Sequence, residues 1–164
     1  MNIEIQPLRE ADIPPAMELK NVLGWNQTPE DWRRFLQLSP EGSYKAIRGG
    51  QLVGTGIACV FDRVCWIGMV IVAESYRGQG HGRLLMQRCL EHAADRRCSL
   101  VQLDATKDGV ALYARLGFRP SHLVGTCRGR IEPPREEARQ VDSPNGVTTA
   151  PVRPADLAEM TALE

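Results

Sequence analysis

The stretch that decides the fold is VIVAESYRGQGHGR, residues Val70 to Arg83. Its first residues end an apolar segment, 64–72, that is typical of a buried strand. Three glycines then indicate a tight loop, because glycine adopts positive φ and lets a ligand approach the backbone. Downstream, apolar residues recur on one face of a predicted helix that ends near Asp95. A loop that opens a helix presents unpaired N–H groups, which favour a bound phosphate.

This loop differs from the two best-known phosphate-binding loops. It lacks the Gly-Lys-Ser/Thr ending of a nucleoside-triphosphate loop. Residues 43–48 and 51–61 read as an antiparallel hairpin that precedes the strand at 64–72. A dinucleotide-binding fold opens instead with a βαβ unit. The order of elements therefore disfavours both of these nucleotide-binding classes.

The flanking segments predict further elements. Residues 2–8 alternate as a strand does, and Asp12 is predicted to cap a helix that ends before Gly24. Thr28, Pro29 and Asp31 form a capping-box pattern for a helix over 29–38. Residues 99–103 read as a strand, and 109–116 as a short helix closed by glycine. A last strand is expected from Phe118 to Cys127.

Two motifs in this order resemble those of the GCN5-related N-acetyltransferase (GNAT) superfamily. Arg77-x-x-Gly80-x-Gly82 is similar to the family's R/Q-x-x-G-x-G/A motif. ALYARLGF, residues 111–118, is similar to its A-L-Y-x-x-L-G-F signature. The resemblance covers residues 3–128. It implies an α/β GNAT fold, in which a mixed, twisted and splayed β-sheet is flanked by helices on both faces.

The resemblance also implies that acetyl-CoA is the cosubstrate, that its acetyl group passes to a primary amine, and that the amine attacks directly in a ternary complex. The loop is expected to hold the pyrophosphate, and the strand edge to pair with the pantetheine arm as an added strand would. The residues expected to bind acetyl-CoA are Val70, Val72, Arg77, Gly78, Gln79, Gly80, His81, Gly82, Arg83 and Thr106. The family often has Asn where this chain has Thr106, and the shorter Thr side chain weakens that assignment.

Three residues are candidates for catalysis. Tyr113 matches the family tyrosine that protonates the departing thiolate; the alternative is a ring that only packs in its helix. Glu74 and Asp104 lie near strand ends and are candidates for the general base. The alternative for both is a solvated loop carboxylate, with water removing the proton instead.

The acceptor is expected to lie against the connection between the first two helices. Trp25 and Asn26 are the predicted substrate-binding residues there, and Trp32 follows in the second helix. Trp32 is interpreted as an anchor of that helix on the sheet. We expect the acceptor to be a small-molecule or peptide amine.

Charge, hydropathy and cysteine spacing disfavour several other classes of protein. Lys plus Arg number 20, as do Asp plus Glu, so no net charge attracts nucleic acid. No apolar run is long enough to cross a membrane, and the first ten residues lack the pattern of a signal peptide. The five cysteines form no C-x-x-C pair, which disfavours a metal site and a disulfide framework. We expect a cytoplasmic protein without a metal. Whether it forms a homodimer is left open by the sequence.

The domain boundaries follow from a change in composition. Residues 1–131 are interpreted as the GNAT domain, and residues 132–146, rich in charge and proline, as a linker. PLREADI at 7–13 is similar to PVRPADL at 151–157, at an offset of 144 residues. This match indicates that residues 147–164 are the start of a second, truncated GNAT-like module. The alternative is a chance similarity between two segments that each lead from a strand into a helix.

The sequence is also compatible with two other functions. The domain could be a non-catalytic acyl-CoA-binding sensor or scaffold, which the retained Tyr113 disfavours. It could also be an interaction domain whose cleft captures a peptide and has no affinity for coenzyme.

Overall fold

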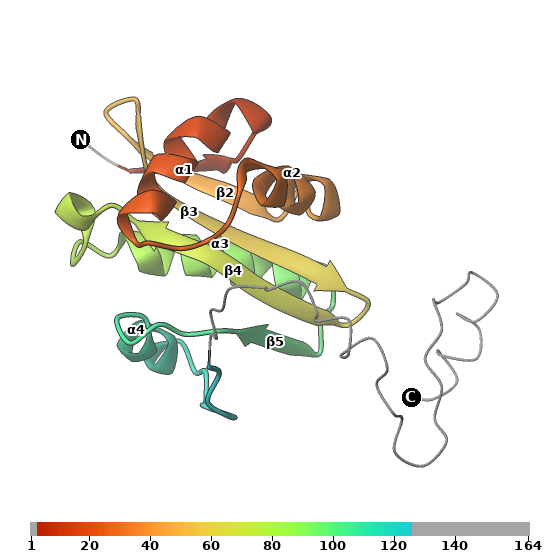
Figure 1. The fold of residues 1–164 in the computed structure, drawn as a ribbon. Helices are drawn as coiled ribbons and strands as arrows, with labels where there is room; N and C mark the ends of the chain where they lie inside the picture. Colours follow the sequence, from red (N-terminus) through yellow and green to blue (C-terminus); the bar gives the residue numbers. More distant parts are fainter. Residues whose placement is uncertain (1–2, 126–164) are drawn as a thin grey trace, which may run out of the picture. The chain divides into compact units, whose positions relative to one another are not determined.

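A five-stranded sheet forms the centre of the protein, shown in Figure 1 as a computed structural model that describes residues 3–125. Its order across the sheet follows the sequence: β1 (Glu4–Pro7), β2 (Ser43–Arg48), β3 (Gln51–Phe61), β4 (Val64–Val72) and β5 (Leu100–Leu103). Neighbouring strands are antiparallel except for β4 and β5, which are parallel. The predicted mixed sheet is therefore confirmed.

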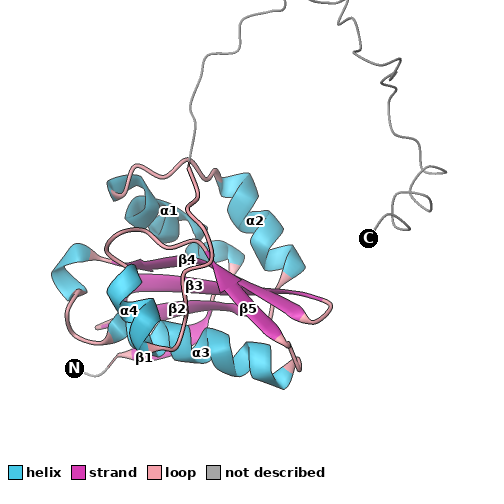
Figure 2. Ribbon diagram, turned by 90° about the horizontal axis from the view of Figure 1, so that it is seen from below, coloured by secondary structure: helices cyan, strands magenta, loops and turns pink. Residues whose placement is uncertain are grey.

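Helices cover both faces of this sheet (Figure 2). One face carries α1 (Ile13–Val22) and α2 (Pro29–Leu38), whose buried Trp32 packs in a core with Ile57. The other face carries α3 (His81–Asp95) and α4 (Val110–Arg115), and its core includes Leu85 and Cys89. Two 3₁₀ turns, η1 (Glu10–Asp12) and η2 (Glu74–Tyr76), connect elements. The interpretation of Trp32 as an anchor holds, since its side chain is fully buried.

A β-bulge in β4 changes the face of the sheet toward which its buried side chains point. Thr55 pairs with Ile71 and Ile57 pairs with Gly68, so two residues of β4 face the single residue Gly56 of β3. The extra residue reverses the faces of the strand: Cys65 and Ile67 belong to the α3 core, whereas Met69 and Ile71 belong to the α1–α2 core. Met69 takes a φ of 52° at the bulge.

The sheet splays on the other side of β4. β5 pairs with residues Val64 to Ile67 only, so the carboxyl half of β4 has no strand partner on that edge within residues 3–125. In Figure 1, β5 and α4 lie to one side of this half of β4. The splayed sheet expected from the sequence is therefore present, and it leaves backbone groups of β4 open.

The caps of the first two helices differ from each other. Thr28 and Asp31 form the predicted capping box, in which the Thr28 N–H donates to Asp31 Oδ2 at 2.8 Å and the Asp31 N–H donates to Thr28 Oγ1 at 3.3 Å. Asp12 stands at the N-cap position of α1 as predicted, but its side chain makes no capping hydrogen bond to that helix. Asp12 instead accepts from the Arg9 N–H at 2.7 Å and from Lys45 Nζ at 2.7 Å, because η1 precedes the helix and turns this carboxylate back.

The prediction of a last strand from Phe118 to Cys127 is wrong over its described part. Residues 118–125 form no strand, and Leu123 is fully exposed. Pro120 lacks the N–H that a sheet ladder needs. Cys127, the linker at 132–146 and the module start at 147–164 lie outside the described residues. Within residues 3–125, no helix combines the length and the apolar character that a bilayer crossing requires.

Candidate active site

A cleft of about 670 Å³ lies along the open half of β4. It is lined from both faces of the sheet, because α4 contributes from one face and the α1–α2 connection from the other. The lining residues are Leu23, Trp25, Val70, Ile71, Val72, Tyr76, Arg77, Gly78, Gly80, His81, Gly82, Arg83, Thr106, Asp108, Gly109, Leu112, Tyr113, Arg115 and Leu116. Most of the residues predicted for the site are thus brought together.

The glycine-rich loop forms one end of the cleft. Gly78 and Gly80 have φ values of 72° and 83°, a region that L side chains rarely adopt. The first intrahelical bond of α3 runs from the Leu84 N–H to the Gly80 carbonyl at 3.1 Å. The N–H groups of residues 81–83 precede that bond, so they are available to an anion together with the positive end of the helix dipole.

The His81 ring is buried beneath this loop. Only 8% of His81 is exposed, and neither ring nitrogen has a hydrogen-bond partner among the described residues. The ring lies beside Tyr76, with centroids 6.4 Å apart. Buried polar atoms without partners are rare in folded proteins, so a ligand atom or a water is the expected partner.

The edge of β4 forms the middle of the cleft. The Ala73 N–H donates to the Val53 carbonyl at 2.9 Å, across to β3. Because backbone groups alternate in an antiparallel ladder, those of Val72, and of Val70 two residues earlier, point away from β3 toward the cleft. The Val72 carbonyl accepts from Arg77 Nε at 3.1 Å. The Val72 N–H and the backbone groups of Val70 are thus left for an extended ligand arm.

Tyr113 stands across the cleft, on α4. Its ring packs edge-on against Phe118, with centroids 6.1 Å apart, and lies over the backbone of Gly109. Its hydroxyl makes no hydrogen bond within residues 3–125 and is free to meet a ligand. Burial raises the pKa of Tyr113 above its ordinary value near 10, so the hydroxyl keeps its proton at neutral pH.

Four of the predicted residues do not line the cleft. Glu74 and Asp104 are exposed carboxylates, and Asn26 is exposed in its loop. Gln79 turns outward: its Oε1 accepts from Arg48 Nη1 at 2.6 Å, and its Nε2 donates to the Ser75 carbonyl at 3.2 Å. Their assigned roles stay predictions. Trp25 and Thr106 do line the cleft, as expected.

Several lining residues were missed in the sequence. Tyr76 directly precedes Arg77. Its ring forms a cation–π contact with Arg48, whose guanidinium lies 5.4 Å from the ring centroid. Arg115 lies within the ALYARLGF motif, where its position two residues after Tyr113 was a usable signal. Leu23 and Asp108 gave no signal, since a lone leucine or aspartate in a loop fits many environments.

The charges around the cleft favour an anion. Arg77, Arg83 and Arg115 line it, and Asp108 is the one acidic side chain among the described lining residues. Guanidinium groups bind phosphate oxygens in a bidentate manner, which suits a polyphosphate ligand. Within residues 3–125, no group of three or more His, Cys, Asp or Glu side chains is placed to hold a metal ion.

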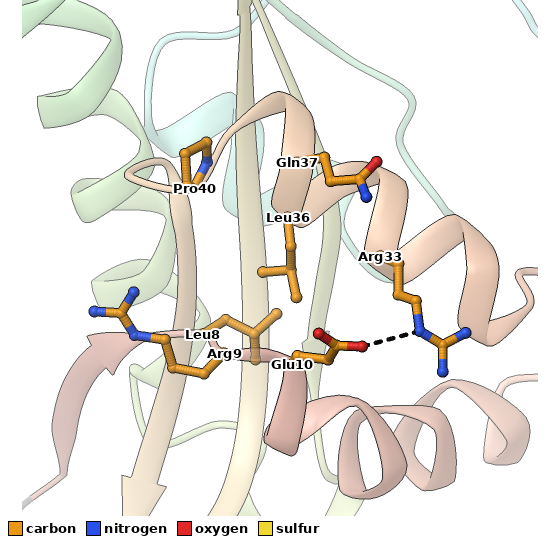
Figure 3. A pocket seen from close by; sticks show the side chains of 7 residues that line it. All are labelled: Leu8, Arg9, Glu10, Arg33, Leu36, Gln37 and Pro40. Atoms are coloured by element: carbon orange, nitrogen blue, oxygen red, sulfur yellow. Dashed lines mark hydrogen bonds and ion pairs between the residues drawn. The ribbon is translucent and has the colours of Figure 1, made fainter.

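A second hollow, of about 260 Å³, lies between η1 and α2 (Figure 3). Its charged side chains include Arg33, which donates to Glu10 at 3.1 Å across the hollow. The two charges neutralise each other, and the side chains of Arg33 and Glu10 are 47% and 74% exposed. This hollow shares no residue with the cleft and offers no unpaired buried group to a ligand within residues 3–125.

Comparison with known proteins also indicates an acetyltransferase. Residues 8–118, more than half of the chain, match the family model described as the acetyltransferase (GNAT) family. Among solved structures, Ard1 from Thermoplasma volcanium superimposes with a TM-score of 0.69 at 20% identity, covering 74% of this chain and 86% of that one. At this identity the likeness shows the fold.

Two curated relatives are also similar in sequence. The uncharacterised N-acetyltransferase YitH of Bacillus subtilis is 29% identical over 126 residues, which are 76% of this chain and 43% of that protein. The N-alpha-acetyltransferase MAK3 of Arabidopsis thaliana is 33% identical over 94 residues, 53% of this chain and 50% of that protein. The chain spans about half the length of these relatives.

Proposed function

Since the chain belongs to the acetyltransferase (GNAT) family, we propose that it transfers an acetyl group from acetyl-CoA to a primary amine. The observation that carries the proposal is the continuity of the cleft. It joins the anion-binding loop at the start of α3, the open edge of β4 and the Tyr113 hydroxyl. These three parts match the phosphates, the pantetheine arm and the sulfur of one extended ligand.

Three parts of the coenzyme have partners in the cleft under this proposal. The pyrophosphate lies against the N–H groups of residues 78–83, with Arg77 and Arg83 beside it. The pantetheine amides pair with the edge of β4 at Val70 and Val72. The thioester carbonyl then lies where an N–H of this strand polarises it as an oxyanion donor.

The transfer needs no covalent enzyme intermediate. The amine nitrogen attacks the thioester carbon, the C–S bond breaks, and the leaving thiolate takes the proton of Tyr113, whose oxygen then regains a proton from solvent. The attacking nitrogen loses its proton to water or to a carboxylate, for which Glu74 and Asp104 are the predicted candidates. Burial raises the pKa values of the Cys59, Cys65 and Cys89 thiols, which disfavours the thiolate that a cysteine nucleophile would need.

The two reactants reach β4 from opposite faces of the sheet. The anion-binding loop and α4 belong to the α3 side, whereas Trp25 belongs to the core beneath α1 and α2. Coenzyme and amine can therefore be bound together, which supports direct attack. Trp25 and Asn26 are the residues assigned to the amine side.

Calorimetric titration with acetyl-CoA tests the proposal. We expect micromolar binding, about −8 kcal/mol, and its loss in Gly80→Val, which places a branched side chain in the cleft at a φ of 83°. Gly50→Val is the matched control, because Gly50 has a φ of 79° in the β2–β3 turn outside the cleft. Equal binding by wild type and Gly80→Val, or none by wild type, would contradict the assignment of the loop.

A further inference from the structure

Lys20 is a buried cation that the mechanism above does not use. It lies in the last turn of α1, and only 6% of it is exposed. Lysines are seldom buried to this degree unless they are paired. Lys20 forms no ion pair with any acidic side chain of residues 3–125, so its ammonium group has another kind of partner.

That partner is the backbone of the α1–α2 connection. Lys20 Nζ donates to the Trp25 carbonyl at 2.9 Å and to the Gln27 carbonyl at 2.9 Å. The connection, residues 23–28, has no regular secondary structure apart from the turn that ends α1. Two charge-assisted hydrogen bonds thus converge on its middle and turn its carbonyl groups inward.

The same connection supplies one wall of the cleft. Leu23 and Trp25 both line it, and both pack against the core beneath α1 and α2. Because the Trp25 carbonyl is held on Lys20, the position of the indole ring depends on that bond. Lys20 itself does not line the cleft.

This wall is apolar. The charged lining residues come from the anion-binding loop, from the first turn of α3, from α4 and from the segment before α4, whereas Leu23 and Trp25 carry no charge. A polycation such as a polyamine needs carboxylates for its second ammonium group, and Asp108 is the one carboxylate among the described lining residues.

We propose that Lys20 is a positioning residue that clamps the α1–α2 connection, so that Leu23 and Trp25 form an apolar acceptor wall for an amine with an apolar substituent. The inference rests on the proposed function for its substrate side. Its structural side, the clamp, stands on the two hydrogen bonds alone.

The test compares Lys20→Met with Lys45→Met. The first variant keeps an unbranched side chain of similar length but loses the ammonium donors. The second removes another mostly buried ammonium, which is paired with Asp12 and does not line the cleft. A general loss of stability affects both variants, whereas the loss of the clamp affects only Lys20→Met.

Hydrogen exchange followed by mass spectrometry tests the clamp without any substrate. The amides of Leu23, Gly24 and Thr28 are hydrogen-bonded in the native connection. In Lys20→Met, we expect their exchange to accelerate by about tenfold or more, since the loss of even one of the two charge-assisted bonds has this effect. Unchanged exchange, or equal acceleration in Lys45→Met, overturns the clamp.

Steady-state acetylation of 2-phenylethylamine and spermidine tests the acceptor class. We expect wild type to favour 2-phenylethylamine in kcat/KM by about tenfold or more, and Lys20→Met to raise the KM for this amine while the Kd for acetyl-CoA stays within about twofold. A preference for spermidine, no turnover of either amine despite acetyl-CoA binding, or an unchanged KM overturns the apolar wall. If the wild type does not bind acetyl-CoA, the proposed function is contradicted. The hydrogen-exchange experiment then still tests the clamp, because it needs no substrate.

Discussion

Replacing Tyr113 with phenylalanine separates catalysis from folding in this cleft. The hydroxyl makes no hydrogen bond within residues 3–125, and phenylalanine keeps the edge-on contact with Phe118. We therefore expect the free energy of unfolding to change by less than about 0.5 kcal/mol. If the hydroxyl protonates the thiolate, its removal should lower kcat by about a hundredfold, which corresponds to about 2.7 kcal/mol of transition-state stabilisation.

The assay is the release of the coenzyme thiol during turnover, with calorimetry for acetyl-CoA affinity and urea unfolding for stability. Tyr76→Phe is the matched control, since Tyr76 also lines the cleft but lies at the anion-binding loop. The raised pKa of Tyr113 predicts that wild-type kcat shows no alkaline decline from this group until above pH 10. A Tyr113→Phe variant with wild-type kcat, or one no slower than Tyr76→Phe, would refute the role of the hydroxyl.

Two further predictions concern β4. Thr55 Oγ1 donates to the Met69 carbonyl at 2.7 Å, so Thr55→Val should cost about 1–3 kcal/mol in urea unfolding by leaving that carbonyl unpaired; Thr55→Ser should restore part of this, and a fully stable Thr55→Val would contradict the argument. Burial, with Cys98 and Cys59 nearby, raises the pKa of Cys65 to about 11. Between about pH 9 and 11 the unfolded thiol loses its proton while the folded one keeps it, so stability should fall as pH rises, with a shallower slope in Cys65→Ala.

The elements predicted correctly are those whose signals are local. Thr28 and Asp31 form a capping box within four residues, and the two glycines after Arg48 fix the turn between β2 and β3. The loop before α3 was also readable, because its glycines stand between a strand and a helix. In each case, the neighbouring residues determine the conformation.

The errors and omissions arise where a distant partner decides. Asp12 is a good capping residue in isolation, but Lys45, 33 residues away, and the Arg9 N–H hold its carboxylate elsewhere. The strand expected from Phe118 is the exception, because Pro120, only two residues further on, is a local signal against a sheet ladder. No local sequence pattern marks Lys20 as buried, and only the folded connection brings two carbonyl groups to its ammonium.

The bulge in β4 links these distant effects to the site. Without the extra residue, Met69 and Ile71 would face α3 as Cys65 and Ile67 do, and Val70 and Val72 would face α1 and α2. With it, the valines pack toward the face that carries α4, where Tyr113 stands. The bulge also coincides with the point beyond Ile67 where β5 stops pairing, so the strand opens its edge where its side chains change faces. The sequence of β4 specifies a buried strand, but the pairing of β3 and β5 against it creates the cleft.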